Sequence, residues 1–90
     1  MEEATMAEWP KYESHKIVQA AKIVAVTVHL GRVTSMDVQP VEGGPIEQFM
    51  PTQEGMADRV TTGDWAMLYP DGFKSCSPAK AFEEGYTKCP

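Results

Sequence analysis

The 90-residue sequence has no long hydrophobic run, which argues against a membrane-spanning helix. Its longest apolar stretch, residues 23–28, is interrupted by Thr27, whereas a spanning helix needs about 20 apolar residues. The first 13 residues carry four glutamates, and they have neither the basic nor the apolar region of a signal peptide. We therefore expect a soluble protein of a cytoplasmic, reducing compartment with no membrane partner.

Cysteine is also scarce, because Cys76 and Cys89 are the only two. In a reducing compartment, and with Cys89 beside the chain end, free thiols are expected rather than a disulfide. His15 and His29 complete a set of two cysteines and two histidines. Neither pair has the close spacing that brings two ligands to one zinc ion. The sequence therefore predicts no metal and no other cofactor.

No catalytic signature is present either. Ser14-His15 and Ser75-Cys76-Ser77 combine reactive side chains, but adjacent residues of a strand point to opposite faces of a sheet. Nothing in these two segments implies that a base activates a nucleophile. We expect a protein that is not an enzyme and that acts by binding.

Basic residues are outnumbered, with eight Lys and Arg against 13 Asp and Glu, for a net charge of −5. The eight are scattered along the chain, which disfavours direct binding of nucleic acid. The negative excess lies between Ser35 and Asp64, where Arg59 is the only basic residue. The carboxylates of this part of the chain are Asp37, Glu42, Glu47, Glu54, Asp58 and Asp64.

These six carboxylates have two interpretations. They can be a solvated face that keeps the protein soluble, or an acidic binding surface that steers a basic protein partner. If they serve solubility alone, the binding surface is to be sought next around Trp9 and the Gly43-Gly44 loop.

Local signals agree best from Gly63 to Tyr86. Apolar residues occupy both alternating faces of residues 65–69, which predicts an inner strand covered on each side. Pro70-Asp71-Gly72 predicts a tight turn with Gly72 at positive φ, followed by a return strand over residues 73–76. Ser77 as N-cap and Gly85 as C-cap predict a two-turn helix over residues 78–84 that packs on this hairpin.

The rest of the chain predicts mostly strands. Alternating Val and Ala or Thr indicates a long strand or bent pair over residues 16–28, and Gly31 indicates a turn into a second strand that ends at Pro40. Residues 42–45 are predicted to form a loop and residues 46–50 a short strand. Residues 51–60 fit either a short helix or a turn.

The expected fold is α+β, with a small antiparallel sheet of four or five strands and one or two short helices. Its C-terminal hairpin is followed by a capped helix. Residues 1–13 are expected to form a loose acidic lead-in and residues 14–90 a single globular domain. A core this small leaves a thin stability margin, so oligomerisation would help. The expected core residues are Val24, Val26, Met36, Val38, Met67, Leu68 and Phe82.

Two segments resemble a group of small uncharacterised proteins of tailed bacteriophages and prophages. The distinctive C-terminal one contains Gly63-Asp64-Trp65, Tyr69-Pro70-Asp71-Gly72-Phe73 and Ser77-Pro78-Ala79-Lys80-Ala81-Phe82-Glu83-Glu84-Gly85-Tyr86, and the N-terminal one covers residues 12–23. The resemblance implies a phage origin and the host bacterial cytoplasm, and it brings no activity or functional residue with it.

With the acidic charge, this favours an accessory protein that binds a host or phage protein with a basic surface and so inhibits or modulates a host defence system. The alternative is a minor virion or assembly component.

Overall fold

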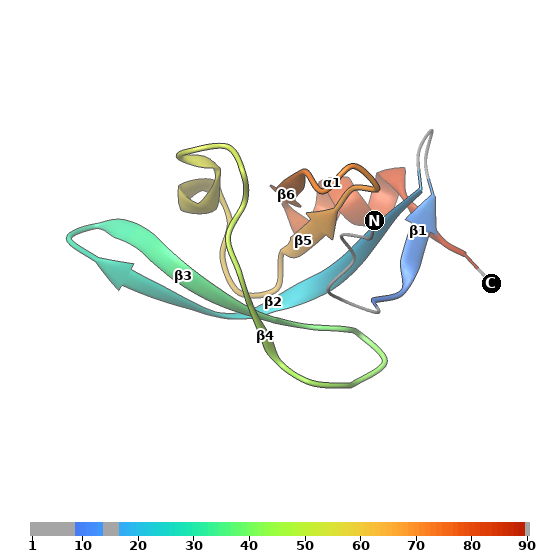
Figure 1. The fold of residues 1–90 in the computed structure, drawn as a ribbon, viewed down its shortest axis with the longest axis horizontal. Helices are drawn as coiled ribbons and strands as arrows, with labels where there is room; N and C mark the ends of the chain where they lie inside the picture. The colour runs from blue at the N-terminus through green and yellow to red at the C-terminus, as the bar shows by residue number, and fades with distance from the viewer. Residues whose placement is uncertain (1–8, 14–16, 90) are drawn as a thin grey trace.

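The computed structural model describes residues 9–13 and 17–89 (Figure 1). Within them, seven strands form one antiparallel sheet, accompanied by one α-helix and one turn of 3-10 helix. The elements are β1 (Lys11–Glu13), β2 (Ile17–His29), β3 (Arg32–Gln39), β4 (Glu47–Phe49), η1 (Met56–Arg59), β5 (Trp65–Leu68), β6 (Lys74–Ser77), α1 (Ala79–Gly85) and β7 (Thr87–Lys88).

The expected sheet of four or five strands is therefore wrong. Strand dominates the structure, and a single short α-helix accompanies it. The additional strands include β1 and β7, which span three residues and two residues. Strands this short give no periodic signal in the sequence, because alternation is recognised only over about four to eight residues.

The long strand β2 organises the sheet. Gln19 pairs with both β1 and β5, and Lys22 pairs with both β3 and β5, so β1 and β3 follow one another along the same side of β2. The bulge between Ile23 and Ala25 makes Val24 an extra residue in this strand. The tip of the β2–β3 hairpin extends away from the rest of the sheet in Figure 1.

The sheet bends back on itself where the segment after β4 reaches β6. The Thr52 N–H donates to the Lys74 carbonyl at 2.8 Å, and the Lys74 N–H donates to Thr52 Oγ1 at 2.9 Å. Beside them, Met56 Sδ accepts from Ser75 Oγ at 3.2 Å and from the Cys76 N–H at 3.3 Å. These contacts cover one edge of β6, which would otherwise present unpaired backbone groups.

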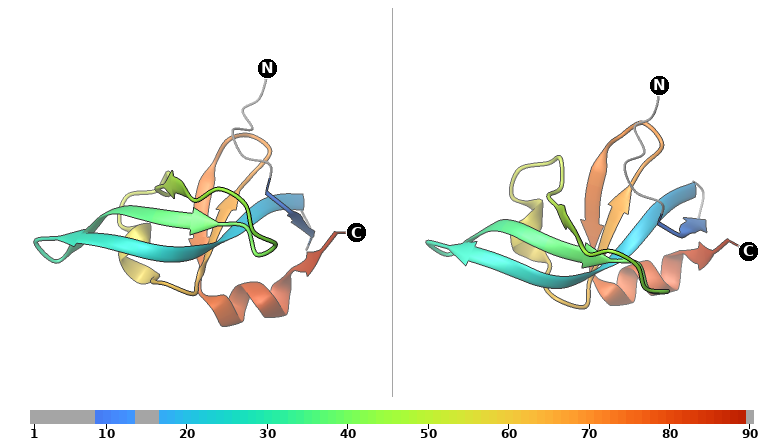
Figure 2. Two further views of the ribbon diagram at one scale, coloured as in Figure 1. Left: turned by 90° about the horizontal axis from the view of Figure 1, so that it is seen from below. Right: turned by 60° about the horizontal axis from the view of Figure 1, so that its bottom comes forward.

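The predicted inner strand is confirmed for residues 65–68, which are all buried and pair with both β2 and β6, whereas Tyr69 lies outside β5 and is half-buried. Trp65 and Met67 pack in a cluster with Phe82 of α1, whereas Ala66 and Leu68 pack in a second cluster with residues of β4 and η1. In both views of Figure 2, α1 lies along one side of β2 and β5.

Most of the expected core is buried, namely Met36, Val38, Met67, Leu68 and Phe82, and Val26 is half-buried against it. Val24 is the exception, with 37% of its surface exposed. Alternation fails at this position because the bulge shifts the faces of β2.

The expectation of a loose lead-in does not hold for residues 9–13. Trp9 is buried and packs against Phe49 with ring centroids 5.7 Å apart, and residues 11–13 form β1. The Ala20 N–H donates to the Pro10 carbonyl at 3.1 Å, which ties this segment to β2. Residues 1–8 lie outside the described part of the chain.

The predicted helix exists, but its caps differ. It begins at Ala79, and Ser77 belongs to β6, where its Oγ donates to the Pro78 carbonyl at 3.2 Å. The Ala79 N–H donates instead to Asp64 Oδ1 at 2.8 Å, so the capping acceptor comes from the loop before β5. Gly85 is the last helical residue rather than a left-handed cap, because Tyr86 follows in an extended conformation.

Gly72 has the positive φ that the turn requires, at 93°. We expect Gly72→Val to lower the free energy of unfolding by about 1–2 kcal/mol or more, because a side chain is strained in this conformation. Gly85→Ala is the control. Gly85 does not have a positive φ, and a Cβ added to it would meet no other atom within 4 Å. Urea denaturation of both variants measures the difference. Equal stability of the two would contradict the strained turn.

Candidate functional site

Two of the six predicted carboxylates hold the fold together. Asp64 is half-buried and accepts from the Thr61 N–H at 3.0 Å as well as from α1. Asp58 accepts from Arg32 Nε at 2.6 Å and from the Val33 N–H at 2.9 Å, which joins η1 to β3. The hydrogen bond from Val33, followed by that from Arg32, lowers the pKa of Asp58. Both carboxylates are therefore engaged within the chain.

The other four lie on or near the β3–β4 hairpin and in the loop that follows it. Asp37 pairs across the sheet with Gln48, next to the buried Met36 and Val38, so its side chain points to the opposite face of β3. Glu54 is exposed in the loop before η1. Glu42 and Glu47 are the two that the structure brings to one pocket.

This pocket, named the Trp9 pocket here, lies between the start of β1 and the β3–β4 connection and has a volume of about 460 Å³. Gly43 and Gly44 both have positive φ and allow the connection to fold back. Its lining residues are Trp9, Pro10, Pro40, Glu42, Gly43, Pro45 and Glu47.

The groups that line the Trp9 pocket are mainly hydrogen-bond acceptors. Its three prolines have no N–H, and the Gly43 N–H already donates to the Pro40 carbonyl at 3.0 Å. The two carboxylates accept only. Within residues 9–13 and 17–89, Trp9 Nε1 is the buried side-chain nitrogen or oxygen that has no hydrogen-bond partner. The pocket therefore offers acceptors and negative charge to a ligand.

A lysine of the same chain already lies at this site. Lys88 of β7 forms an ion pair with Glu42. Both residues also line an adjoining pocket of about 560 Å³, which shares Pro10 and Glu42 with the Trp9 pocket. An ammonium group is thus accommodated at the edge of the Trp9 pocket.

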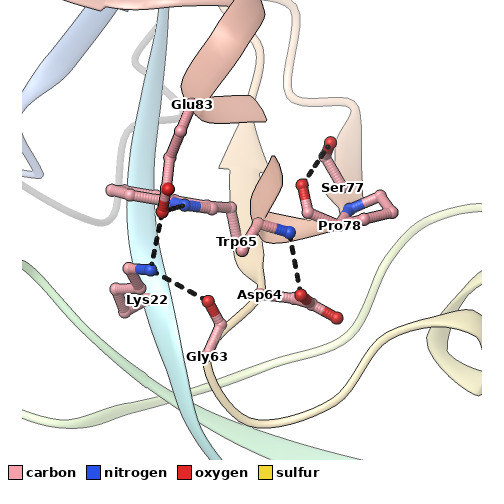
Figure 3. A network of polar contacts seen from close by, with 8 residues as sticks. Lys22, Gly63, Asp64, Trp65, Ser77, Pro78 and Glu83 are labelled. Carbon is pink, nitrogen blue, oxygen red and sulfur yellow. Dashed lines mark hydrogen bonds and ion pairs between the residues drawn. The ribbon is translucent and has the colours of Figure 1, made fainter. Parts of the chain in front are cut away.

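A second polar cluster has a structural role (Figure 3). Lys22 Nζ donates to Glu83 Oε2 and to the Gly63 carbonyl, each at 2.9 Å, and Trp65 Nε1 donates to the same Glu83 oxygen at 3.1 Å. This explains a glutamate near the C-terminus of α1, where helix electrostatics alone disfavour it. The cluster fastens α1 to β2 and β5. Sequence reasoning missed it, because Lys22 and Glu83 lie far apart in the chain.

The Lys22–Glu83 pair predicts a pH dependence. The hydrogen bonds from Lys22 and then Trp65 lower the pKa of Glu83 in the folded state. Their contribution is present above the ordinary carboxyl pKa and is lost as the pH falls through the lowered value. Glu83→Gln, and to a lesser degree Lys22→Gln, which keeps the Trp65 hydrogen bond, should therefore show a smaller loss of stability than wild type on acidification. Chemical denaturation from neutral pH to about pH 3 tests this, and an unchanged acid profile in both variants would contradict it.

In the described part of the chain, the reactive side chains considered above bond to groups other than a base: Ser75 Oγ donates to Met56 Sδ and Ser77 Oγ to the Pro78 carbonyl. Cys76 and Cys89 are free thiols, and burial, followed by the charge of Asp64, raises the pKa of Cys76 to about 12. Such a thiol is almost entirely protonated near neutral pH and is a poor nucleophile. The pair Ser14-His15 lies outside the described residues, and His29 is exposed at the end of β2.

Comparison of the chain with protein-family models, with curated proteins and with solved structures finds no match. In the described part of the chain, no helix is long and apolar enough to cross a membrane. In the same part, no three His, Cys, Asp or Glu side chains lie close enough together to hold a metal ion.

Proposed function

We propose that this chain is a phage-encoded accessory protein that binds a basic protein in the host bacterial cytoplasm and thereby modulates a host defence system. The observation that carries the proposal is the Trp9 pocket. Its lining contains the carboxylates of Glu42 and Glu47 and three prolines, which have no N–H to donate. The resemblance of residues 12–23 and 63–86 to phage proteins supports the origin.

Electrostatics favour a basic protein over other partners. Negative charge at Glu42 and Glu47 attracts Lys and Arg side chains and repels phosphate, so nucleic acid is disfavoured. Such charges act mainly by accelerating encounter, and their effect decreases with salt. The proposed partner is a protein with an accessible basic segment.

Affinity capture from a host bacterial lysate tests this function. We compare the wild type with the Glu42→Gln/Glu47→Gln variant, and Glu13→Gln/Glu84→Gln removes two exposed charges elsewhere as the control. Asp58 and Asp64 are kept, because their substitution would disturb the fold. We expect one host protein to be captured by the wild type and by the Glu13→Gln/Glu84→Gln control, but not by the Glu42→Gln/Glu47→Gln variant. Equal retention by all three proteins would refute a role for these carboxylates.

The second candidate function, a minor virion or assembly component, is favoured by the β2–β3 hairpin. Leu30 at its tip is 87% exposed and has a positive φ of 53°, which is unusual for leucine. A projecting apolar residue of this kind fits insertion into another subunit, including a second copy of the chain. Mass spectrometry of purified virions tests this candidate. If the chain is a virion component, the wild-type chain is found in the particles and the Leu30→Ser variant is missing from them.

A further inference from the structure

We propose that the Trp9 pocket binds one arginine residue of a partner polypeptide. This inference rests on the proposed function and names what the acidic site recognises. With about 460 Å³, the pocket is near the small end of the range for ligand sites. It therefore suits one side chain with its adjoining backbone rather than an extended surface.

The chemistry of the wall selects a cation that only donates. Glu42 and Glu47 supply acceptors, the three prolines have no N–H group to donate, and the Gly43 N–H is already used. A neutral ligand with acceptors of its own would find few donors beside the Glu47 carboxylate, and the charge of Glu42 is balanced by Lys88 until a ligand displaces it. A guanidinium or ammonium group matches this wall in both respects.

Arginine fits better than lysine for two reasons. Its five donors lie in one plane, so it can serve two carboxylates at once, whereas an ammonium is a compact point charge. Its guanidinium is also weakly hydrated and packs well on apolar walls, which Pro10, Pro40 and Pro45 provide here. Lys88 at Glu42 shows that a cation is accommodated at the edge of the site, and it competes with the ligand for that carboxylate.

Trp9 favours an arginine within a peptide over free arginine or a free guanidine. Its Nε1 lacks an acceptor among the described residues and is itself buried, so a shift of the indole ring would be needed for a peptide carbonyl beside the arginine to accept from it. This indole N–H also gives a direct readout by NMR. The other indole, that of Trp65, donates to Glu83 in the cluster under α1 and serves as an internal reference.

The test is a titration of the ¹⁵N-labelled full chain with an acetylated, amidated pentapeptide, Ala-Gly-Arg-Gly-Ala. The same peptide with citrulline in place of arginine is the matched neutral control. We expect saturable shifts of the Trp9 indole and Gly43 amide signals with the arginine peptide, and about tenfold weaker binding or worse with citrulline. The Trp65 indole signal should stay in place.

Variants locate the binding within the pocket. Glu47→Gln should weaken the arginine peptide about tenfold, whereas Glu84→Gln on the exposed face of α1 should leave its affinity unchanged. Lys88→Gln should strengthen it, because the competing ammonium is removed. Circular dichroism confirms that each variant is folded before titration.

Four results would overturn the inference. They are the absence of any shift at the Trp9 pocket, equal affinity for the arginine and citrulline peptides, tighter binding of the same pentapeptide with lysine in place of arginine, and an affinity that Glu47→Gln leaves intact. The proposed function is judged separately by the capture experiment. If capture depends on Glu42 and Glu47 while the arginine peptide fails, the acidic binding surface stands and the arginine assignment falls.

Discussion

Replacing Phe82 with alanine is expected to lower the free energy of unfolding by about 3–5 kcal/mol, enough to unfold a domain of this size. Phe82 is 1% exposed. Its ring centroid lies 4.4 Å from that of Trp65, 4.6 Å from that of Tyr86 and 5.1 Å from that of Tyr12. Phe82 is the buried residue of α1, so removing its ring takes away most of the apolar contact between α1 and the sheet, and α1 is too short to be stable alone.

Phe73→Ala is the control for Phe82→Ala, because Phe73 is 38% exposed beside the β5–β6 turn. Urea denaturation followed by circular dichroism measures both variants. We expect a much smaller loss for Phe73→Ala. Similar losses for the two substitutions would mean that α1 is not held to the sheet by Phe82.

Replacing Leu68 with alanine tests the opposite face of β5. Leu68 is 5% exposed and belongs to the cluster that includes Trp9, Met36 and Phe49. The expected loss is about 2–5 kcal/mol, from lost burial and from the cavity left behind. The size of the loss depends on how far the cluster collapses into that cavity.

Leu30→Ala makes the same chemical change at an exposed position, where Leu30 is 87% exposed at the tip of the β2–β3 hairpin. It should change stability by less than about 0.5 kcal/mol. Thermal and urea unfolding of the two variants provide the comparison. Wild-type stability of Leu68→Ala would show that β5 is not covered on both faces.

The hairpin of β5 and β6 could be predicted because several local signals coincide there. Apolar residues on both alternating faces indicate a covered strand, and Pro70-Asp71-Gly72 indicates the turn. The structure has both features, with all of β5 buried and Gly72 at positive φ. Local chemistry determines this part of the fold.

Other features depend on residues distant in sequence and could not be predicted. The cap of α1 comes from Asp64, although Ser77 stands directly before Pro78 as a capping residue would. Ser77 is drawn into β6 by pairing with Trp65. The predicted number of strands was wrong for a similar reason. β1 and β7 are short, and they form because β1 pairs with β2 and β7 pairs with β1.

The candidate site was visible in the sequence only in part. Charge counting identified Glu42 and Glu47, but it could not separate them from Asp58 and Asp64, which the fold uses internally. The sequence named Trp9 and the Gly43-Gly44 loop only as an alternative to the carboxylates. That they share one pocket with Glu42 and Glu47 follows from tertiary structure, since β2 and β3 lie between Trp9 and the β3–β4 connection in the chain.

The central claim is that Glu42 and Glu47 form the surface by which this chain binds a basic protein. Its most direct test is the association rate with the captured partner, measured at low and at physiological ionic strength for the wild type and for Glu42→Gln/Glu47→Gln. We expect the variant to be folded and as stable as the wild type, to associate more slowly at low salt, and to respond less to salt, because screening acts over about 8–10 Å. A folded variant that associates at the wild-type rate in low salt would contradict the claim.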